Sequence, residues 1–177
     1  MAAYIHRSFP WVFTVLPKFG DSDSVVTVDI SSEEPLFGTS FHSFRIVNAY
    51  STVSCDTHIH SVPPEALFSD PGIPLLVVGD LNIHNPLSDP LRSFSSREIS
   101  SSAPYFELAA DLGFALLNPP GEYTRFPLVG SPRPSVLDLA FANPLLLPLV
   151  RSWESSLPST GSDHIPITIN LAPPFQE

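Results

Sequence analysis

Three short segments of the sequence carry polar side chains that could do chemistry, and each lies where an apolar strand pattern begins or ends. The first, LLVVGDLNIH at 75–84, closes a buried-type strand with Asp80 and Asn82, which point to the same side of an extended backbone. A carboxylate and a carboxamide aimed together can hold a cation or a water molecule. The alternative interpretation is an Asx turn, in which the Asp80 side chain only bonds to nearby backbone.

The second segment, SVLDLAFA at 135–142, places Asp138 inside an otherwise apolar strand. Burying a carboxylate is costly unless it is paired or hydrogen-bonded, and an imidazole is a natural partner. An aspartate that holds a histidine in one tautomer is a recurring catalytic arrangement. The alternative is that Asp138 lies at a strand edge in contact with water.

The third segment, STGSDHIPI at 159–167, places Asp163 and His164 side by side after a turn and before the last strand pattern. This pair can be an ordinary solvated turn in which the aspartate bonds to its own backbone. His164 is nevertheless available to supply the imidazole that Asp138 needs. We therefore expect the three segments to converge on one cleft at the strand ends.

Short strands are expected to position these residues, because twenty-one prolines break the chain and nearly exclude long helices. A helix is predicted at 104–114, opened by Pro104 and closed by Gly113, and a shorter one at 63–70. The serine-rich segment 86–103 is predicted to be a surface loop, with a helical turn inside it as the alternative. Strands with long irregular connections and few helices predict an α+β layered domain. The predicted strands lie at 25–30, 44–50, 74–80, 135–143 and 165–171.

The composition is that of one globular domain with an acidic balance. A chain of 177 residues with 43% hydrophobic residues is long enough for a core and too apolar for disorder. No signal peptide or membrane span is recognised, so we expect an intracellular protein. The net charge of −10 repels a polyanion unless positive groups cluster or a metal intervenes, which argues against a nucleic-acid partner. Cys55 is expected to be an inert loop or packing residue.

In this order, GDLNIH, SVLDLAF and GSDHIPI resemble the C-terminal motifs of the endonuclease/exonuclease/phosphatase superfamily. More narrowly, RIVNAYS, LLVVGDLNIH, YTRFP, RPSVLDLAF and PSTGSDHIPI resemble the endonuclease domain of fungal non-LTR retrotransposons, and the resemblance runs through nearly the whole chain. It implies a four-layered α/β/β/α sandwich that cleaves phosphodiester bonds of DNA, in the nucleus, with Mg²⁺ or Mn²⁺.

The resemblance also implies a role for each matched residue. Asp80 would polarise the attacking water or bind metal, and Asn82 would orient the phosphate. Asp138 would orient His164, which would contact the scissile phosphate or act in proton transfer. Asp163 would be a metal ligand. The implied metal set is Asp80, Asn82, Asp163 and His164.

Five further positions carry weaker implications. Tyr50, which ends RIVNAY, matches a phosphate-contacting tyrosine, although a strand-end aromatic is equally compatible. Ser135 matches a small polar residue before the orienting aspartate. Arg125 and Arg133 lie on one expected β-hairpin that would contact DNA near the cut, or else they are simply solvated. His84 occurs at this place in many retrotransposon relatives, and a surface role fits it as well.

The resemblance predicts an incomplete site. The superfamily begins with a strand carrying an Asn, followed by a Gln-Glu motif whose glutamate is a principal metal ligand, and this chain starts after both. Glu33 and Glu34 do not match that motif, and Glu177 only follows the last strand. Over residues 1–177 we therefore expect a single, N-terminally incomplete domain whose cleavage is impaired or absent.

Two kinds of partner and two other functions accompany this expectation. The partners are the missing N-terminal part and a reverse transcriptase encoded by the same element. The alternative functions are a non-catalytic remnant or binding module, and another phosphodiesterase or phosphatase of the superfamily. We also expect unpaired sheet edges that favour aggregation.

Overall fold

The structure, a computed structural model, describes residues 11–16, 24–54, 59–68, 72–126, 133–156 and 161–172. In this part of the chain the strands form one mixed sheet, in the order β1-β2-β3-β4-β6-β5, and one antiparallel pair, β7-β8. The strands are β1 (Val12–Val15), β2 (Val25–Ser31), β3 (Ser43–Tyr50), β4 (Leu75–Asp80), β5 (Ala115–Leu116), β6 (Asp138–Ala142), β7 (Val150–Ser155) and β8 (Ile167–Leu171). The helices are α1 (Pro64–Leu67) and α2 (Ser96–Asp111), with short 3-10 turns η1 (Leu36–Gly38) and η2 (Leu147–Leu149).

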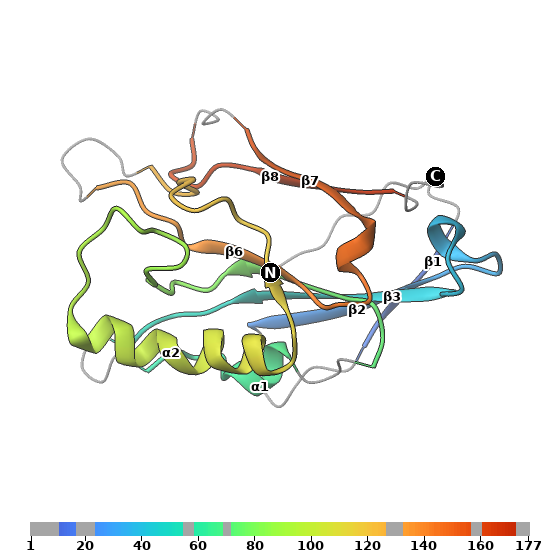
Figure 1. Cartoon of the computed structure of the whole chain (residues 1–177), viewed down its shortest axis with the longest axis horizontal. Coiled ribbons are helices and arrows are strands. Elements are labelled where there is room, and N and C mark those ends of the chain that lie inside the picture. Colours follow the sequence, from blue (N-terminus) through green and yellow to red (C-terminus); the bar gives the residue numbers. More distant parts are fainter. Residues whose placement is uncertain are drawn as a thin grey trace.

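The layers follow from the strand connections. β3 and β4 are parallel, with α1 between them in sequence, whereas the other neighbouring pairs of the large sheet are antiparallel. α1 and α2 cover one face of this sheet, and the β7-β8 pair lies over the opposite face (Figure 1). The fold is α+β, as the sequence predicted. Of the four expected layers, the described residues show one helical layer and the two sheets.

Apolar residues alternate along the central strands, so the large sheet has a hydrophobic surface on both faces. On β3 and β4, Val47 and Val77 belong to the core on the helical side. Their neighbours Ile46 and Val78 belong to the second core, which also contains residues of β7 and β8. The large sheet is therefore held between two apolar layers, and its strand ends are left to carry polar groups.

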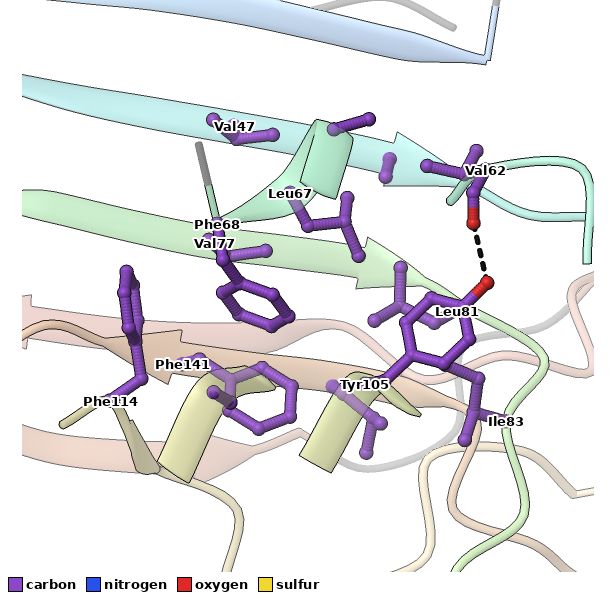
Figure 2. Close-up of a cluster of buried hydrophobic side chains, with 14 of the residues drawn as sticks. Val47, Val62, Leu67, Phe68, Val77, Leu81, Ile83, Tyr105, Phe114 and Phe141 are labelled. Carbon is purple, nitrogen blue, oxygen red and sulfur yellow. Dashed lines mark hydrogen bonds between the residues drawn. The ribbon is translucent and has the colours of Figure 1, made fainter. Parts of the chain in front are cut away.

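The helical core fixes α2 against the sheet (Figure 2). The rings of Phe68 and Phe114 pack edge to face with centroids 5.0 Å apart, and Phe68 makes a similar contact with Phe141. The buried Tyr105 hydroxyl donates a hydrogen bond to the Val62 carbonyl oxygen. These contacts fix α2 and the segment that follows it against the sheet and against the residues around α1.

α2 begins at Ser96, so the prediction of a surface loop over 86–103 was wrong in its second half. A capping box starts the helix: the Glu98 amide donates to the Ser95 hydroxyl, and the Glu98 carboxylate accepts from the Ser95 amide. Pro104 lies inside the helix rather than at its start. At this interior position proline removes one backbone hydrogen bond of the helix. Gly113 follows the helix with φ of +75°, consistent with the predicted end.

The other predicted elements agree more closely with the structure. The strands predicted at 25–30, 44–50, 74–80 and 165–171 and the short helix predicted within 63–70 are all present. The strand predicted over 135–143 begins only at Asp138, because Ser135 forms an isolated bridge with Arg125 instead. Cys55 and Glu177 lie outside the described residues.

Candidate active site

The ends of three neighbouring strands lie side by side at one end of the large sheet. β3 ends at Tyr50 and the parallel β4 ends at Asp80, and these two residues are in register. β6 runs antiparallel to β4 and begins there, so Asp138 pairs with Asp80 across the sheet. The register therefore brings together three residues that the sequence singled out at separate motifs.

These residues line a cleft of about 520 Å³ at the sheet edge. Asp80 and Asp138 are both partly buried there, and the Tyr50 side chain is exposed at the same opening. The cleft is lined by Ser24, Asn48, Ala49, Tyr50, Gly79, Asp80 and Asp138. Its size and mixture of apolar walls with convergent polar groups are those of a ligand-binding site.

The backbone conformation at position 79 explains why glycine precedes Asp80. Its φ is +141°, and a Cβ at this position would lie 1.9 Å from the Ala49 carbonyl oxygen of β3. No side chain fits such an approach, so any substitution would push β3 and β4 apart. The glycine lets the two strand ends stay adjacent, which keeps Asp80 beside Tyr50.

His164 joins the cleft from the segment before β8. Its Nδ1 lies 2.8 Å from Asp138 Oδ2, which is the contact that the sequence predicted, and its Nε2 lies 3.9 Å from Asp80 Oδ2. A short backbone bridge between His164 and Arg125 holds this segment near the large sheet. An Nδ1–H donated to Asp138 fixes the ring orientation and leaves Nε2 facing the second carboxylate.

Asp138 is itself held by buried groups. The Thr124 hydroxyl oxygen, which is fully buried, accepts hydrogen bonds from the amides of Leu137 and Asp138 at 3.0 Å. The Asn118 side chain donates to the Asp138 carbonyl oxygen. Thr124 was not among the predicted site residues, although it lies inside the YTRFP motif. Its place in that motif, next to Arg125, was the available signal.

The electrostatic environment of Asp80 is unusual. Burial, followed by repulsion from Asp138, raises the pKa of Asp80 to about 6, and attraction from His164 opposes this shift only in part. The carboxylate therefore changes its protonation state close to neutral pH. A carboxyl group with such a pKa in a cleft is suited to proton transfer.

The placement of Asn82 differs from the sequence argument. β4 ends at Asp80, and Asn82 has a left-handed φ of +50°, so the two side chains are not related by an extended backbone. The Asn82 amide donates to Asp80 Oδ1 at 3.2 Å, and its side chain donates to the Ser51 carbonyl oxygen. This is the Asx turn considered as the alternative, and it orients the Asp80 carboxylate.

Asp163 faces a guanidinium group. Its Oδ2 accepts a hydrogen bond from Arg125 Nε at 2.8 Å, and both side chains are about one-third exposed. The Arg125 guanidinium holds the pKa of the Asp163 carboxyl below its usual range. In this arrangement Asp163 is engaged by an arginine rather than turned to the Asp80–Asp138 pair.

The donor set fits a divalent cation only in part. Carboxylate oxygens are the ligands that Mg²⁺ prefers, and Asp80 and Asp138 supply them in one cleft. Within the described ranges, however, no three His, Cys, Asp or Glu side chains are grouped so as to hold a metal ion. Glu33 and Glu34 follow β2, whose end pairs with the start of β3. They therefore lie near the end of β3 that is opposite to Tyr50.

The remaining sequence-predicted residues lie in a second hollow of about 510 Å³. Arg125, Arg133, Ser135 and His84 all line it. The β-hairpin expected to carry the two arginines includes residues 127–132, which lie outside the described residues. Ser135 is buried, and its backbone pairs with that of Arg125. Arg125 belongs to both sites, because it lines this hollow and also contacts Asp163 of the first site.

Two facing β-sheets with carboxylates and a histidine at one set of strand ends define a fold of the endonuclease/exonuclease/phosphatase superfamily. A family model described as endonuclease-reverse transcriptase matches residues 44–168, and the chain belongs to this family. The match includes every candidate catalytic residue given above.

Solved structures of related enzymes share the fold at low sequence identity. The endonuclease domain of TRAS1, a telomere-specific non-LTR retrotransposon, has a TM-score of 0.67 and 18% identity over 91% of this chain and 68% of its own. The AP endonuclease LMAP from Leishmania major has a TM-score of 0.66 and 16% identity over 93% of this chain and 62% of its own. A 3′ phosphatase, NExo, from Neisseria, bound to a product DNA hairpin, has a TM-score of 0.55 and 15% identity over 92% of this chain and 79% of its own.

No curated protein sequence is significantly similar to the chain. Among the described residues, no helix has the length and apolar character needed to cross a membrane.

Proposed function

We propose that this chain is a phosphodiesterase of the retrotransposon endonuclease type, acting on DNA in the nucleus. The observation that carries the proposal is the Asp80–His164–Asp138 arrangement at the strand ends, within a chain of the endonuclease-reverse transcriptase family. DNA as the substrate is supported by the related structures, one of which was solved with a DNA product.

Hydrolysis in this cleft divides the proton transfers between two groups. A water oxygen attacks phosphorus and gives its proton to the Asp80 carboxylate, whose pKa of about 6 makes it a competent base at neutral pH. The phosphorus–oxygen bond to the leaving strand breaks, and that oxygen takes a proton from Nε2 of His164. Asp138 stabilises the imidazolium, while Tyr50 at the cleft opening donates a hydrogen bond to a phosphate oxygen.

Members of this family generally depend on a divalent metal, which would supply charge stabilisation of the phosphate oxygens. We propose that this chain binds Mg²⁺ weakly, through the carboxylates of Asp80 and Asp138. Asp163 joins the set only when Arg125 releases it. Because the described residues supply only part of the ligand set, catalysis in Mg²⁺ is impaired. A reverse transcriptase encoded by the same element would be the natural partner of such a site.

The partial ligand set also supports a second candidate function, a non-catalytic DNA-binding module. Plasmid nicking separates the two. In low millimolar Mg²⁺ we expect the chain to nick supercoiled plasmid no faster than its His164→Ala variant. In tens of millimolar Mn²⁺, which accepts a less regular ligand geometry, the chain should exceed both His164→Ala and Asp138→Asn by on the order of a hundredfold.

The matched control is His42→Ala, because His42 is exposed and precedes the start of β3, at the end of that strand far from Tyr50. It should nick at the rate of the unchanged chain. Equal nicking rates for the chain and His164→Ala in both metals would exclude the phosphodiesterase and leave the non-catalytic DNA-binding module as the function. Strong nicking in low Mg²⁺ that His164→Ala abolishes would show that the chain does hold a complete cation site.

A further inference from the structure

The backbone of Arg125 is held between the two segments that carry Asp138 and His164. On one side it exchanges two hydrogen bonds of 3.0 Å with the backbone of Ser135, which leads into β6. On the other side it forms an isolated antiparallel bridge with His164. The position of Arg125 is therefore fixed relative to both parts of the active-site cleft.

The bridge places the Arg125 side chain beside that of His164. The backbone hydrogen bonds at this bridge are made by the residues that flank the pair. In an antiparallel pair of this kind the two opposite side chains lie on the same face, with Cβ atoms about 4.5–5.5 Å apart. Burial raises the pKa of Asp80, and the charge of Arg125 is among those that oppose this rise. The guanidinium group therefore lies near both groups that the proposed reaction uses for proton transfer.

The contact between Arg125 and Asp163 uses only one of the guanidinium nitrogens. Among the described residues, the Arg125 side chain makes one hydrogen bond, from Nε to Oδ2 of Asp163 at 2.8 Å. Arg45 provides the contrast, because it binds Asp29 through both Nε and Nη2, at 2.7 and 3.0 Å. A guanidinium group has five N–H donors. The two Nη groups of Arg125 therefore keep their donors for a ligand while Asp163 holds Nε.

Asp163 is placed to orient this guanidinium group. Its backbone carbonyl accepts from the Phe126 amide at 2.7 Å, which ties the segments of the carboxylate and the guanidinium group together. The hydrogen bond from Arg125 lowers the pKa of Asp163, so the carboxylate is charged at neutral pH. Both side chains are about one-third exposed, and such an ion pair contributes little to stability. What the contact fixes is the direction of the guanidinium group, as the Asp138 contact fixes the ring of His164.

We propose that Arg125 contacts the phosphate of the substrate beside His164, and that Asp163 positions Arg125 rather than binding the divalent cation. The Nη groups donate to phosphate oxygens while Nε stays with Asp163, so the ion pair persists when the substrate binds. A guanidinium group presents paired N–H donors that match the spacing of phosphate oxygens. Because the carboxylate offsets part of the positive charge, the contact orients the phosphate more than it adds affinity. The proposal rests on the proposed function for the nature of the substrate.

Phosphate binding in EDTA tests the Arg125 contact without any cleavage. Inorganic phosphate is titrated into the full chain, and binding is followed by the NMR signals of the His164 ring. The double variant Arg125→Gln/Asp163→Asn removes one positive and one negative charge, so the net charge stays at −10. It should bind phosphate on the order of tenfold more weakly than the unchanged chain, which is the loss expected for a hydrogen bond to a charged group. Equal affinities, or no phosphate binding by the unchanged chain, would overturn the proposal.

The matched control is the double variant Arg45→Gln/Asp29→Asn. It removes another partly exposed ion pair with the same charge balance, near the start of β3, whereas Tyr50 lies at the end of that strand. It should leave the phosphate affinity unchanged. A loss of the same size in this variant would show that phosphate does not bind at Arg125.

Asp163→Asn and Asp163→Ala separate orientation from charge. Both remove the same negative charge, but only asparagine keeps an oxygen that accepts from Nε of Arg125. Phosphate should bind about fivefold more weakly to the alanine variant than to the asparagine variant. The Arg125 Nε–H signal should be visible in the asparagine variant and lost to exchange with water in the alanine variant. Equal phosphate affinities in the two variants would mean that Asp163 does not position Arg125.

Mn²⁺ titration followed by electron paramagnetic resonance tests whether Asp163 belongs to the cation ligands. If Asp163 stays with Arg125, the double variant Arg125→Gln/Asp163→Asn should bind Mn²⁺ as tightly as the unchanged chain. Weaker Mn²⁺ binding by this charge-balanced variant would make Asp163 a cation ligand and overturn its positioning role.

The outcome is distinguishable from that of the proposed function. Phosphate binding that depends on Arg125, by a chain that never nicks plasmid, would keep this contact and remove the nuclease. Plasmid nicking that depends on His164 and is unchanged in the Arg125→Gln/Asp163→Asn variant would keep the nuclease and remove the contact.

Discussion

At the scale of single residues, the active-site cleft combines destabilising groups that have a chemical use. Asp80 and Asp138 are adjacent carboxylates in a partly buried cleft, and among the described residues the ion-pair contact of each is with His164. Such groups lower stability when they are charged, and they are retained where a shifted pKa is useful. Asp80 shows the effect most clearly.

Replacing Asp80 by Asn should stabilise the protein in a pH-dependent way. The folded state raises the pKa of Asp80 from 3.8 to about 6, so the protonated form is favoured by folding and the charged form is penalised. Below pH about 4 the residue is neutral in both states and the penalty vanishes, whereas above pH about 6 it is fully present. With allowance for solvent screening, we expect Asp80→Asn to add about 1–2 kcal/mol at pH 8.

Thermal unfolding in EDTA at pH 4.5 and pH 8 checks this prediction. The melting temperature of Asp80→Asn should exceed that of the unchanged chain at pH 8, and the difference should be much smaller at pH 4.5, where most of the penalty is gone. Asp111→Asn, at the exposed end of α2, is the control and should show no such divergence. A gain that is equal at both pH values would mean that charge at Asp80 is not the cause.

At the scale of elements, the loop at 117–126 connects the two sheets through hydrogen bonds rather than through a strand. Thr124 accepts from two amides of the segment that enters β6, and its carbonyl oxygen accepts from the amide of Ile165 just before β8. Asp138 belongs to the large sheet and His164 to the segment that precedes β8, so their 2.8 Å contact depends on this loop. The loop is therefore an active-site element even where its side chains do not face the cleft.

Thr124→Val should destabilise the fold while keeping its shape. The buried valine cannot accept the amides of Leu137 and Asp138, and leaving buried donors unsatisfied costs about 1–3 kcal/mol. Thr124→Ser keeps the oxygen and loses only one methyl group, which costs about 1 kcal/mol. Urea unfolding of the two variants measures the difference. A valine variant as stable as the serine variant would show that the hydroxyl is not needed.

The sequence predicted the central elements well because their signals are local. Alternation of apolar residues identified β2, β3 and β4, and the cost of an unpaired carboxylate in an apolar strand indicated the contact of Asp138 with His164. β1, β5 and β7 were missed. β5 contains only two residues, and the others carry polar or exposed positions that interrupt the pattern.

The misses at the site have different physical causes. The contact between Asp163 and Arg125 joins residues far apart in sequence, and no periodicity reports on such a pair. The left-handed turn at Asn82 depends on the carbonyl of Ser51 in the neighbouring segment.

At the scale of the whole molecule, two apolar regions are left incompletely covered. A cleft of about 370 Å³ separates the large sheet from β8, and Ile46, Val78, Ile167 and Ile169 line it. The outer strand β1 exposes Val12 and Val15, at 64% and 68% of their surface. Among the described strands, β1 and β8 each pair with one neighbour only. Exposed apolar groups on edge strands favour pairing between chains.

We expect the purified chain to self-associate, and to do so more strongly as salt is added. The net charge of −10 repels a second copy, and this repulsion is screened within about 8 Å at physiological ionic strength, whereas apolar contacts are not weakened by salt. Size-exclusion chromatography with light scattering, at low and high sodium chloride, should show oligomers that grow with both salt and protein concentration. Val15→Lys removes an exposed apolar side chain of β1, adds a charge there and should reduce the oligomers. Thr14→Lys is the control, because it adds the same charge to the same strand without removing an apolar side chain. The two variants together separate the effect of charge from the effect of apolar surface. A monomer at every salt and protein concentration would mean that these surfaces are covered within one chain.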